Sequence, residues 1–183
     1  ASGDYAGKSV SAAGDVNCDG YQDILVGALL NDSNAIDAGA TYLVLGPVTG
    51  DMDLSDADLT LLGENENDKV GEALSAGDAD GDGLDDLLIG TGEYDITGAG
   101  NAGAAYLVLG DSIVDEGALT TSSLSLASAD AQIFGAASED RLGNVMSCDG
   151  DLDGDGDDDL AIAAQGAEPG GAVYVFYDDP SGL

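Results

Sequence analysis

The sequence contains no histidine and no tryptophan, and only three of its 183 residues are basic. Without histidine, the usual base of a Ser-His-Asp triad and the commonest ligand of catalytic zinc are both missing. No apolar run approaches the roughly 20 residues that a membrane-spanning helix needs. With three prolines and no tryptophan, the core has to be built from Val, Ile, Leu, Ala and Tyr.

The charge balance is strongly acidic. Thirty-seven acidic residues face only Lys8, Lys69 and Arg141, which gives a net charge of −34. Such a field repels nucleic acid and anionic lipid, so we expect neither nucleic-acid binding nor membrane insertion. The length fits one domain with a core of ordinary size.

Three acidic segments share one pattern, and each is followed at once by an apolar run. They are Asp15–Asp23, Asp78–Asp86 and Asp151–Asp159, called loops 1, 2 and 3 below. Each loop has oxygen-bearing side chains at its positions 1, 3, 5 and 9 and glycine at position 6. The glycine permits the sharp turn that returns position 9 to the others.

This spacing predicts a calcium site in each loop, because calcium takes six to eight oxygen ligands in a tolerant geometry. The backbone carbonyl of position 7 is the natural additional ligand. The candidate side-chain ligands are Asp15, Asn17, Asp19 and Asp23 in loop 1, Asp78, Asp80, Asp82 and Asp86 in loop 2, and Asp151, Asp153, Asp155 and Asp159 in loop 3. The candidate carbonyl ligands are those of Tyr21, Leu84 and Asp157.

Three alternatives compete with the calcium interpretation. An EF-hand needs a bidentate Glu at position 12 and a helix on each side, whereas position 12 here is Val26, Ile89 or Ile162 inside a strand-like run. Magnesium favours a water-rich octahedron over so many protein oxygens. A merely solvated acidic turn would explain a single loop, but it explains three in register poorly.

The similarity between the three segments extends beyond the loops. Each repeat reads as a short strand, the acidic loop, a second strand and a third strand, and the first two repeats continue into an outer strand. Four antiparallel strands with short turns are typical of one blade of a β-propeller. We therefore expect an all-β fold of three tandem propeller-type blades at 5–63, 69–135 and 141–177, with no outer strand of its own in the third.

These segments resemble FG-GAP repeats, the units of the integrin alpha-subunit propeller. The resemblance covers 7–28 with 39–46, 71–90 with 103–110, and 143–164 with 171–177. It implies calcium in the loop between the first two strands of each blade. Ala6, Val70 and Leu142 stand where the family has an aromatic residue. We interpret Lys69 and Arg141 as partners of carboxylates in neighbouring blades, and Tyr42, Tyr106 and Tyr174 as packing between blades.

Three blades are too few to close a propeller ring. The strand ending at Val175–Tyr177 should therefore be an exposed edge, which favours contact with other chains or with copies of this one. Cys18 and Cys148 could form a disulfide or remain two semi-buried thiols. Asn31-Asp32-Ser33 is a glycosylation sequon. With the absence of an initial Met and the calcium loops, it favours an extracellular or cell-surface location.

Three functional hypotheses follow. The first is a non-enzymatic, extracellular calcium-binding module for adhesion or ligand binding, in which calcium is structural. The second is a subunit that assembles into an extracellular fibre, tube or sheath. The third is a carboxylate-based glycosidase, ranked last because calcium claims the conspicuous carboxylates and Asp85, Asp157 and Asp158 read as solvated loop acids. If the repeats are semi-independent, Asp82→Ala should affect one site only.

Overall fold

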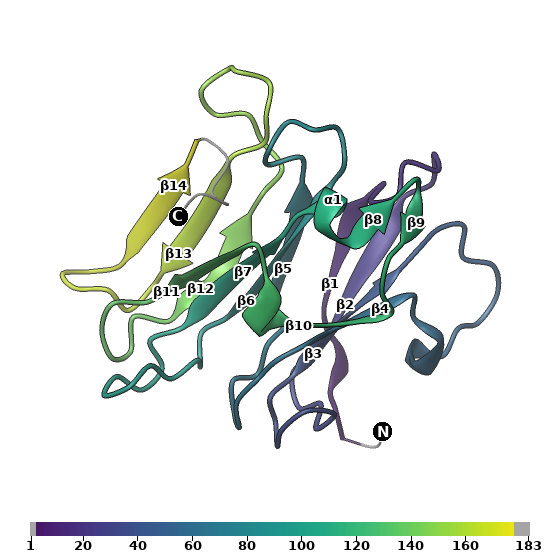
Figure 1. The fold of residues 1–183 in the computed structure, drawn as a ribbon. Helices are drawn as coiled ribbons and strands as arrows, with labels where there is room; N and C mark the ends of the chain where they lie inside the picture. Colours follow the sequence, from purple (N-terminus) through teal and green to yellow (C-terminus); the bar gives the residue numbers. More distant parts are fainter. Residues whose placement is uncertain (1–2, 178–183) are drawn as a thin grey trace.

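The computed structural model describes residues 3–177 and is all-β, with three main sheets standing side by side (Figure 1). The first sheet contains β1 (Ala6–Gly14), β2 (Asp23–Ala28), β3 (Ala40–Val44), β4 (Leu59–Leu62) and β10 (Ser123–Ser125), in that order. Its first four strands are antiparallel, while β10 runs parallel to β4. A short 3-10 turn, η1 (Leu54–Asp56), precedes β4.

The second and third sheets repeat the same antiparallel order. The second contains β5 (Ala73–Gly77), β6 (Asp86–Thr91), β7 (Ala104–Val108) and β11 (Ala131–Phe134). The third contains β12 (Leu142–Ser147), β13 (Leu160–Ala164) and β14 (Ala172–Phe176). The expected all-β class is confirmed, and within residues 3–177 the sheets do not close into a barrel.

The segment between β7 and β11 has structure that the repeat pattern does not predict. It forms the single-turn helix α1 (Gly110–Ile113), the hairpin β8 (Val114–Asp115) and β9 (Ala118–Leu119), then β10 and a 3-10 turn, η2 (Leu126–Ser128). Through β10 this segment pairs with the outer edge of the first sheet before the chain returns to β11 in the second. The segment between β7 and β11 thereby connects the first two sheets, because it leaves the second sheet, pairs with β4 of the first through β10, and then returns.

Apolar residues from adjacent sheets meet in two clusters. In one, Leu25 and Leu43 of the first sheet are completely buried with Leu87 and Ile89 of the second. Burying each such side chain stabilises the fold by about 1.5–3 kcal/mol. Tyr106 belongs to this cluster. The other lies between the second and third sheets and includes the following side chains: Leu88, Leu107, Leu142, Leu160 and Ile162.

Glycines allow the sheets to approach one another closely at equivalent places in the repeat. A Cβ atom on Gly27 would lie 2.2 Å from the carbonyl oxygen of Gly71, and one on Gly90 would lie 2.1 Å from that of Gly143. Both distances are shorter than real Cβ contacts, so only glycine fits there without a shift of the backbone. The repeated pattern of glycines therefore has a packing cause.

Several expectations about single residues are settled by their contacts. Cys18 is exposed and Cys148 is buried, and both are free thiols. Asn31 is buried, and its amide donates to the Tyr42 hydroxyl. The Lys69 ammonium pairs at 2.6 Å with Glu93.

The expected partners of Lys69 and Arg141 were wrong. Glu93 follows β6 in the same repeat as Lys69, and Arg141 pairs at 3.1 Å with Glu139, two residues away in the sequence. Among residues 3–177, neither cation forms an ion pair with a carboxylate of a neighbouring repeat. Both residues have positive φ, 51° at Lys69 and 52° at Arg141.

The third sheet ends in an exposed strand. Among the described residues, β14 pairs only with β13, so its other edge is unpaired. Val145 and Val173 on this sheet are 61% and 65% exposed, whereas every residue of β6 and β7 in the second sheet is buried. The exposed edge expected at the third repeat is therefore present in residues 3–177.

Candidate metal centre

The three acidic loops lie at the same end of the sheets, one beside the next (Figure 1). Each connects the first and second strands of a sheet: loop 1 joins β1 to β2, loop 2 joins β5 to β6, and loop 3 joins β12 to β13. The position-9 residues Asp23, Asp86 and Asp159 are only 1%, 1% and 3% exposed. The strand that follows each loop thus carries a buried carboxylate at its start.

Backbone amides hold these buried carboxylates in place. In each loop the position-9 carboxylate accepts from the amide of position 2, over 2.9 Å from Val16 and from Ala79 and 2.5 Å from Leu152. Asp23 and Asp86 also accept, each over 2.8 Å, from the amides of Gly46 and Gly110 after the third strand. A carboxylate oxygen has further lone pairs, so these bonds leave it able to bind a cation.

The carboxylates at positions 1 and 5 shape the turn itself. Position 1 accepts from glycine amides within its own loop, as Asp15 does from Gly20 at 2.8 Å and Asp78 from Gly83 at 3.0 Å. Position 5 accepts from the amide of position 7, as Asp82 does from Leu84 at 2.8 Å. The side chains therefore curl inward over a turn in which position-6 glycine adopts positive φ.

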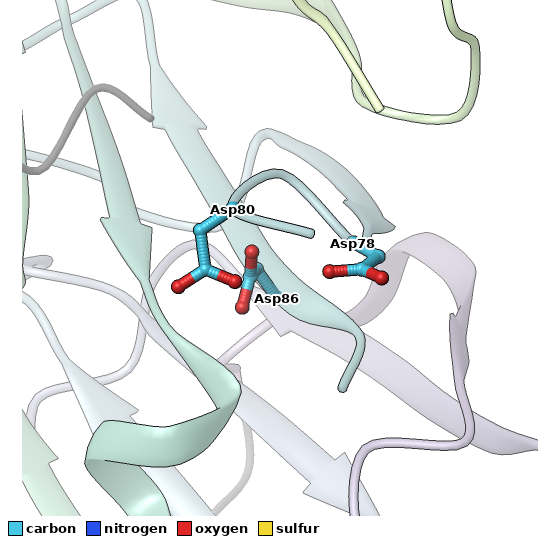
Figure 2. Close-up of side chains that lie close together, drawn as sticks. All are labelled: Asp78, Asp80 and Asp86. Carbon is cyan, nitrogen blue, oxygen red and sulfur yellow. The ribbon is translucent and has the colours of Figure 1, made fainter. Parts of the chain in front are cut away.

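In two loops the predicted ligands converge. Asp78, Asp80 and Asp86 offer carboxylate oxygens that all lie within 4.8 Å of one another (Figure 2). Asp151, Asp153 and Asp159 form the equivalent group in loop 3. Among the described residues, loop 1 has no such trio of carboxylates. Its position 3 is Asn17, an amide that donates at 3.2 Å to Asp19.

The structure also adds a residue that the repeat did not indicate. Asp111 in α1 lies with Asp80 and Asp82 in a group whose oxygens are within 4.8 Å of one another. Asp155, the position-5 residue of loop 3, belongs to no such group among the described residues. Because Asp111 lies outside the loop motif, only the path of the chain after β7 brings it there.

The electrostatics show the cost of gathering these acids. Burial raises the pKa of Asp86 to about 7, against the lowering effect of its bonds from Gly110 and Ala79. Burial also raises the pKa of Asp80, against the lowering effect of the bond from the Asp82 amide. The carboxylates are thus held in a place where negative charge is unfavourable without a compensating cation.

Two carboxylate oxygens in the loops are buried without a hydrogen-bond partner: Asp78 Oδ1 and Asp159 Oδ1. A buried acceptor without a partner costs about 1–3 kcal/mol, and more when charged. A hard cation in each of loops 2 and 3 would satisfy these oxygens, and carboxylate and carbonyl oxygens are the donors that calcium prefers. Position 12 lies within β2, β6 or β13, which agrees with exclusion of an EF-hand.

The interpretation of Asp85 and Asp158 as solvated loop acids was wrong. Asp85 accepts from the amide of Asp15 at 2.7 Å, and Asp158 accepts from the amide of Asp78 at 3.2 Å. Each therefore contacts the loop of the preceding sheet. The error arose because their roles depend on how neighbouring sheets pack, which a single loop sequence does not indicate.

Comparison with known proteins identifies the type of repeat. The family model described as FG-GAP repeat matches residues 70–108 and 150–176. This chain carries FG-GAP repeats. The matched segments contain loops 2 and 3 whole, together with the strands that follow them, so the family pattern and the convergent carboxylates coincide.

Several curated relatives align with most of the chain. Integrin alpha-PS5 of Drosophila melanogaster is 34% identical over 178 residues, which is 95% of this chain and 16% of the relative. Integrin alpha-4 of Xenopus laevis is 29% identical over 186 residues, 99% of this chain and 16% of the relative. Phosphatidylinositol-glycan-specific phospholipase D of Rattus norvegicus is 30% identical over 182 residues, which is 93% of this chain and 20% of the relative.

The chain therefore spans a fifth or less of the length of these relatives. In residues 3–177, no helix has the length and hydropathy required to cross a bilayer.

Proposed function

We propose that this FG-GAP chain is a non-enzymatic, propeller-like module for adhesion or ligand binding outside the cell, stabilised by three structural calcium ions. The ions occupy loops 1, 2 and 3, and the repeats at 5–63, 69–135 and 141–177 act as three blades. Similarity to integrin alpha subunits over most of the chain supports protein partners and an extracellular or cell-surface setting.

The observation that carries the calcium proposal is the buried, unpartnered oxygen of Asp159 beside Asp151 and Asp153. Loop 2 repeats the arrangement with Asp78 Oδ1 and its neighbours. When bound, calcium would supply positive charge that lets several carboxylates share one turn. The chain's own part is to orient them, through amide bonds to position 9 and through the turn at position-6 glycine.

Calcium is expected to protect the three loops from proteolysis. We expect a protease that cleaves after Asp and Glu to cut within 15–23, 78–86 and 151–159 when calcium is chelated. The carboxylates repel one another without a cation, so the loops should open. With saturating calcium, mass spectrometry should find these cuts suppressed, whereas magnesium should protect poorly. Equal cleavage of the loops with and without calcium, against an unstructured control peptide, would contradict the proposal.

A second candidate function is a subunit of an extracellular fibre, tube or sheath. The exposed Val145 and Val173 favour it, as does the edge of β14, which pairs with no other strand of residues 3–177. An apolar sheet face and an open edge both invite contact with another chain. The net charge of −34 opposes association of copies, so such assembly would need calcium or high salt.

Electron microscopy and sedimentation in calcium distinguish the two candidates. A binding module is expected to remain a uniform monomer at micromolar concentration. Ordered filaments would instead establish the assembly function, because a head-to-tail contact that does not close produces them. A chelated sample serves as the control for charge repulsion.

The glycosidase hypothesis receives little support from the carboxylates outside the ligand sets. A cleft of about 270 Å³ between the sheets is lined by Asp85, Asp149 and Asp158. Asp85 and Asp158 each accept from a backbone amide, and Asp149 accepts from the Ser147 hydroxyl at 2.6 Å. These acids have structural partners, which supports a non-enzymatic role.

A further inference from the structure

The three loops are connected to one another across the boundaries between sheets. Position 8 of loop 2, Asp85, accepts through Oδ2 from the amide of Asp15, position 1 of loop 1, at 2.7 Å. Position 8 of loop 3, Asp158, accepts through Oδ2 from the amide of Asp78, position 1 of loop 2, at 3.2 Å. The same two repeat positions therefore meet at both boundaries.

Further contacts accompany these bonds. The amide of Asp158 donates to the carbonyl of Asp78 at 2.8 Å, which makes the second connection reciprocal. A Cβ atom on Gly14 would lie 2.0 Å from Asp85 Oδ2, and one on Gly77 would lie 2.7 Å from Asp158 Oδ2. The glycine before position 1 thus makes room for the carboxylate of the next repeat.

Position 8 lies between two proposed ligands of its own loop. In loop 2, Asp85 follows the carbonyl ligand Leu84 and precedes the buried carboxylate of Asp86. A cation that binds both neighbours fixes the backbone on each side of Asp85. The Asp85 carboxylate in turn holds the amide of Asp15, whose own carboxylate organises loop 1 by accepting from Gly20.

We propose that Asp85 and Asp158 are positioning residues that couple calcium binding at neighbouring loops, so that the three ions bind cooperatively. This inference rests on the proposed calcium function. Order imposed at one loop is transmitted to the next through contacts of the position-8 residue, and by thermodynamic linkage the coupling acts in both directions. It replaces the expectation that Asp82→Ala affects one site only.

The chain offers a reporter for loop 1 alone. Tyr21 occupies position 7 of loop 1, whereas loops 2 and 3 have Leu84 and Asp157 there. Terbium can replace calcium in oxygen sites, and a tyrosine beside the ion sensitises its luminescence. Tyr21→Phe removes the sensitising tyrosine but retains the carbonyl ligand. The part of the terbium luminescence that this change removes therefore measures occupancy of loop 1.

The test removes a ligand from loop 2 and measures affinity at loop 1. Asp82→Ala is expected to weaken terbium binding at loop 1 about fivefold or more, the lower range of measured site coupling. In an Asp85→Ala background, Asp82→Ala should cause no further weakening at loop 1. Asp85→Asn retains an acceptor oxygen for the Asp15 amide and should preserve most of the coupling. If the charge of Asp85 caused the coupling, Asp85→Asn would remove it.

Failure of the coupling and failure of the calcium function give different results in this experiment. If loop 1 binds terbium equally well with and without Asp82→Ala, the sites are independent and the coupling is refuted. The same holds if Asp82→Ala still weakens loop 1 by as much in the Asp85→Ala background. The comparison of loop 1 affinity with and without Asp82→Ala keeps Asp85 unchanged. It therefore tests the coupling even if the Asp85→Ala variant does not fold. Absence of all terbium and calcium binding would instead refute the calcium function itself.

Discussion

Chelation of calcium is expected to lower the melting temperature of the protein by about 15 °C or more. An ion present at 100 times its dissociation constant stabilises the folded state by about 2.7 kcal/mol per site. Three such sites together contribute about 8 kcal/mol, and for a domain of this size each kcal/mol corresponds to roughly 2–4 °C. The raised pKa of the buried Asp86 points the same way, because its charge is unfavourable without a cation.

Calorimetry or circular dichroism at moderate salt measures this shift. Addition of excess calcium to the chelated sample should restore the original melting curve, and magnesium at the same concentration should restore little of it. A melting temperature that chelation leaves unchanged would contradict a structural role for calcium. The measurement belongs at fixed ionic strength, since salt alone screens the acidic surface.

Gly77→Ala is expected to destabilise the protein by about 2–3 kcal/mol, or roughly 5–10 °C in melting temperature. A Cβ atom at Gly77 would lie only 2.0 Å from the carbonyl oxygen of Cys148. Because that atom belongs to the backbone leading into loop 3, the third sheet has to move away from the second. Thermal melts in saturating calcium measure the cost.

Gly150→Ala is the matched control for this prediction. Gly150 holds the same repeat position before loop 3, and a Cβ atom there would meet nothing within 4 Å. Its substitution should change stability by no more than about 0.5 kcal/mol. Equal melting temperatures for the two variants would show that the second and third sheets are not packed as closely as described.

Local patterns in the sequence were enough to predict the all-β class and the positions of most strands. The runs after each acidic loop are short, apolar and bounded by glycine and aspartate, and they form β2, β6 and β13. The FG-GAP resemblance was carried by the same local residues. The strands and loops could be predicted because the same local pattern of residues occurs in each of the three repeats.

Features that depend on contact between repeats were not predicted. The roles of Asp85 and Asp158 arise only when one loop packs against the next. Asp111 reaches loop 2 because α1 follows β7 at the loop end of the sheet, a position that no spacing rule within the motif indicates. The polar segment that forms β8, β9 and β10 lacks the alternation of a half-buried strand, so its pairing with β4 could not be foreseen.

The most direct test of structural calcium binding is the number of calcium ions bound per chain, measured by calorimetric titration of the chelator-treated protein at moderate salt. Three ions per chain are expected, and two are expected for a variant in which both Asp151 and Asp153 are replaced by Ala. Absence of saturable calcium binding by the folded protein would contradict the proposal that these loops are structural calcium sites.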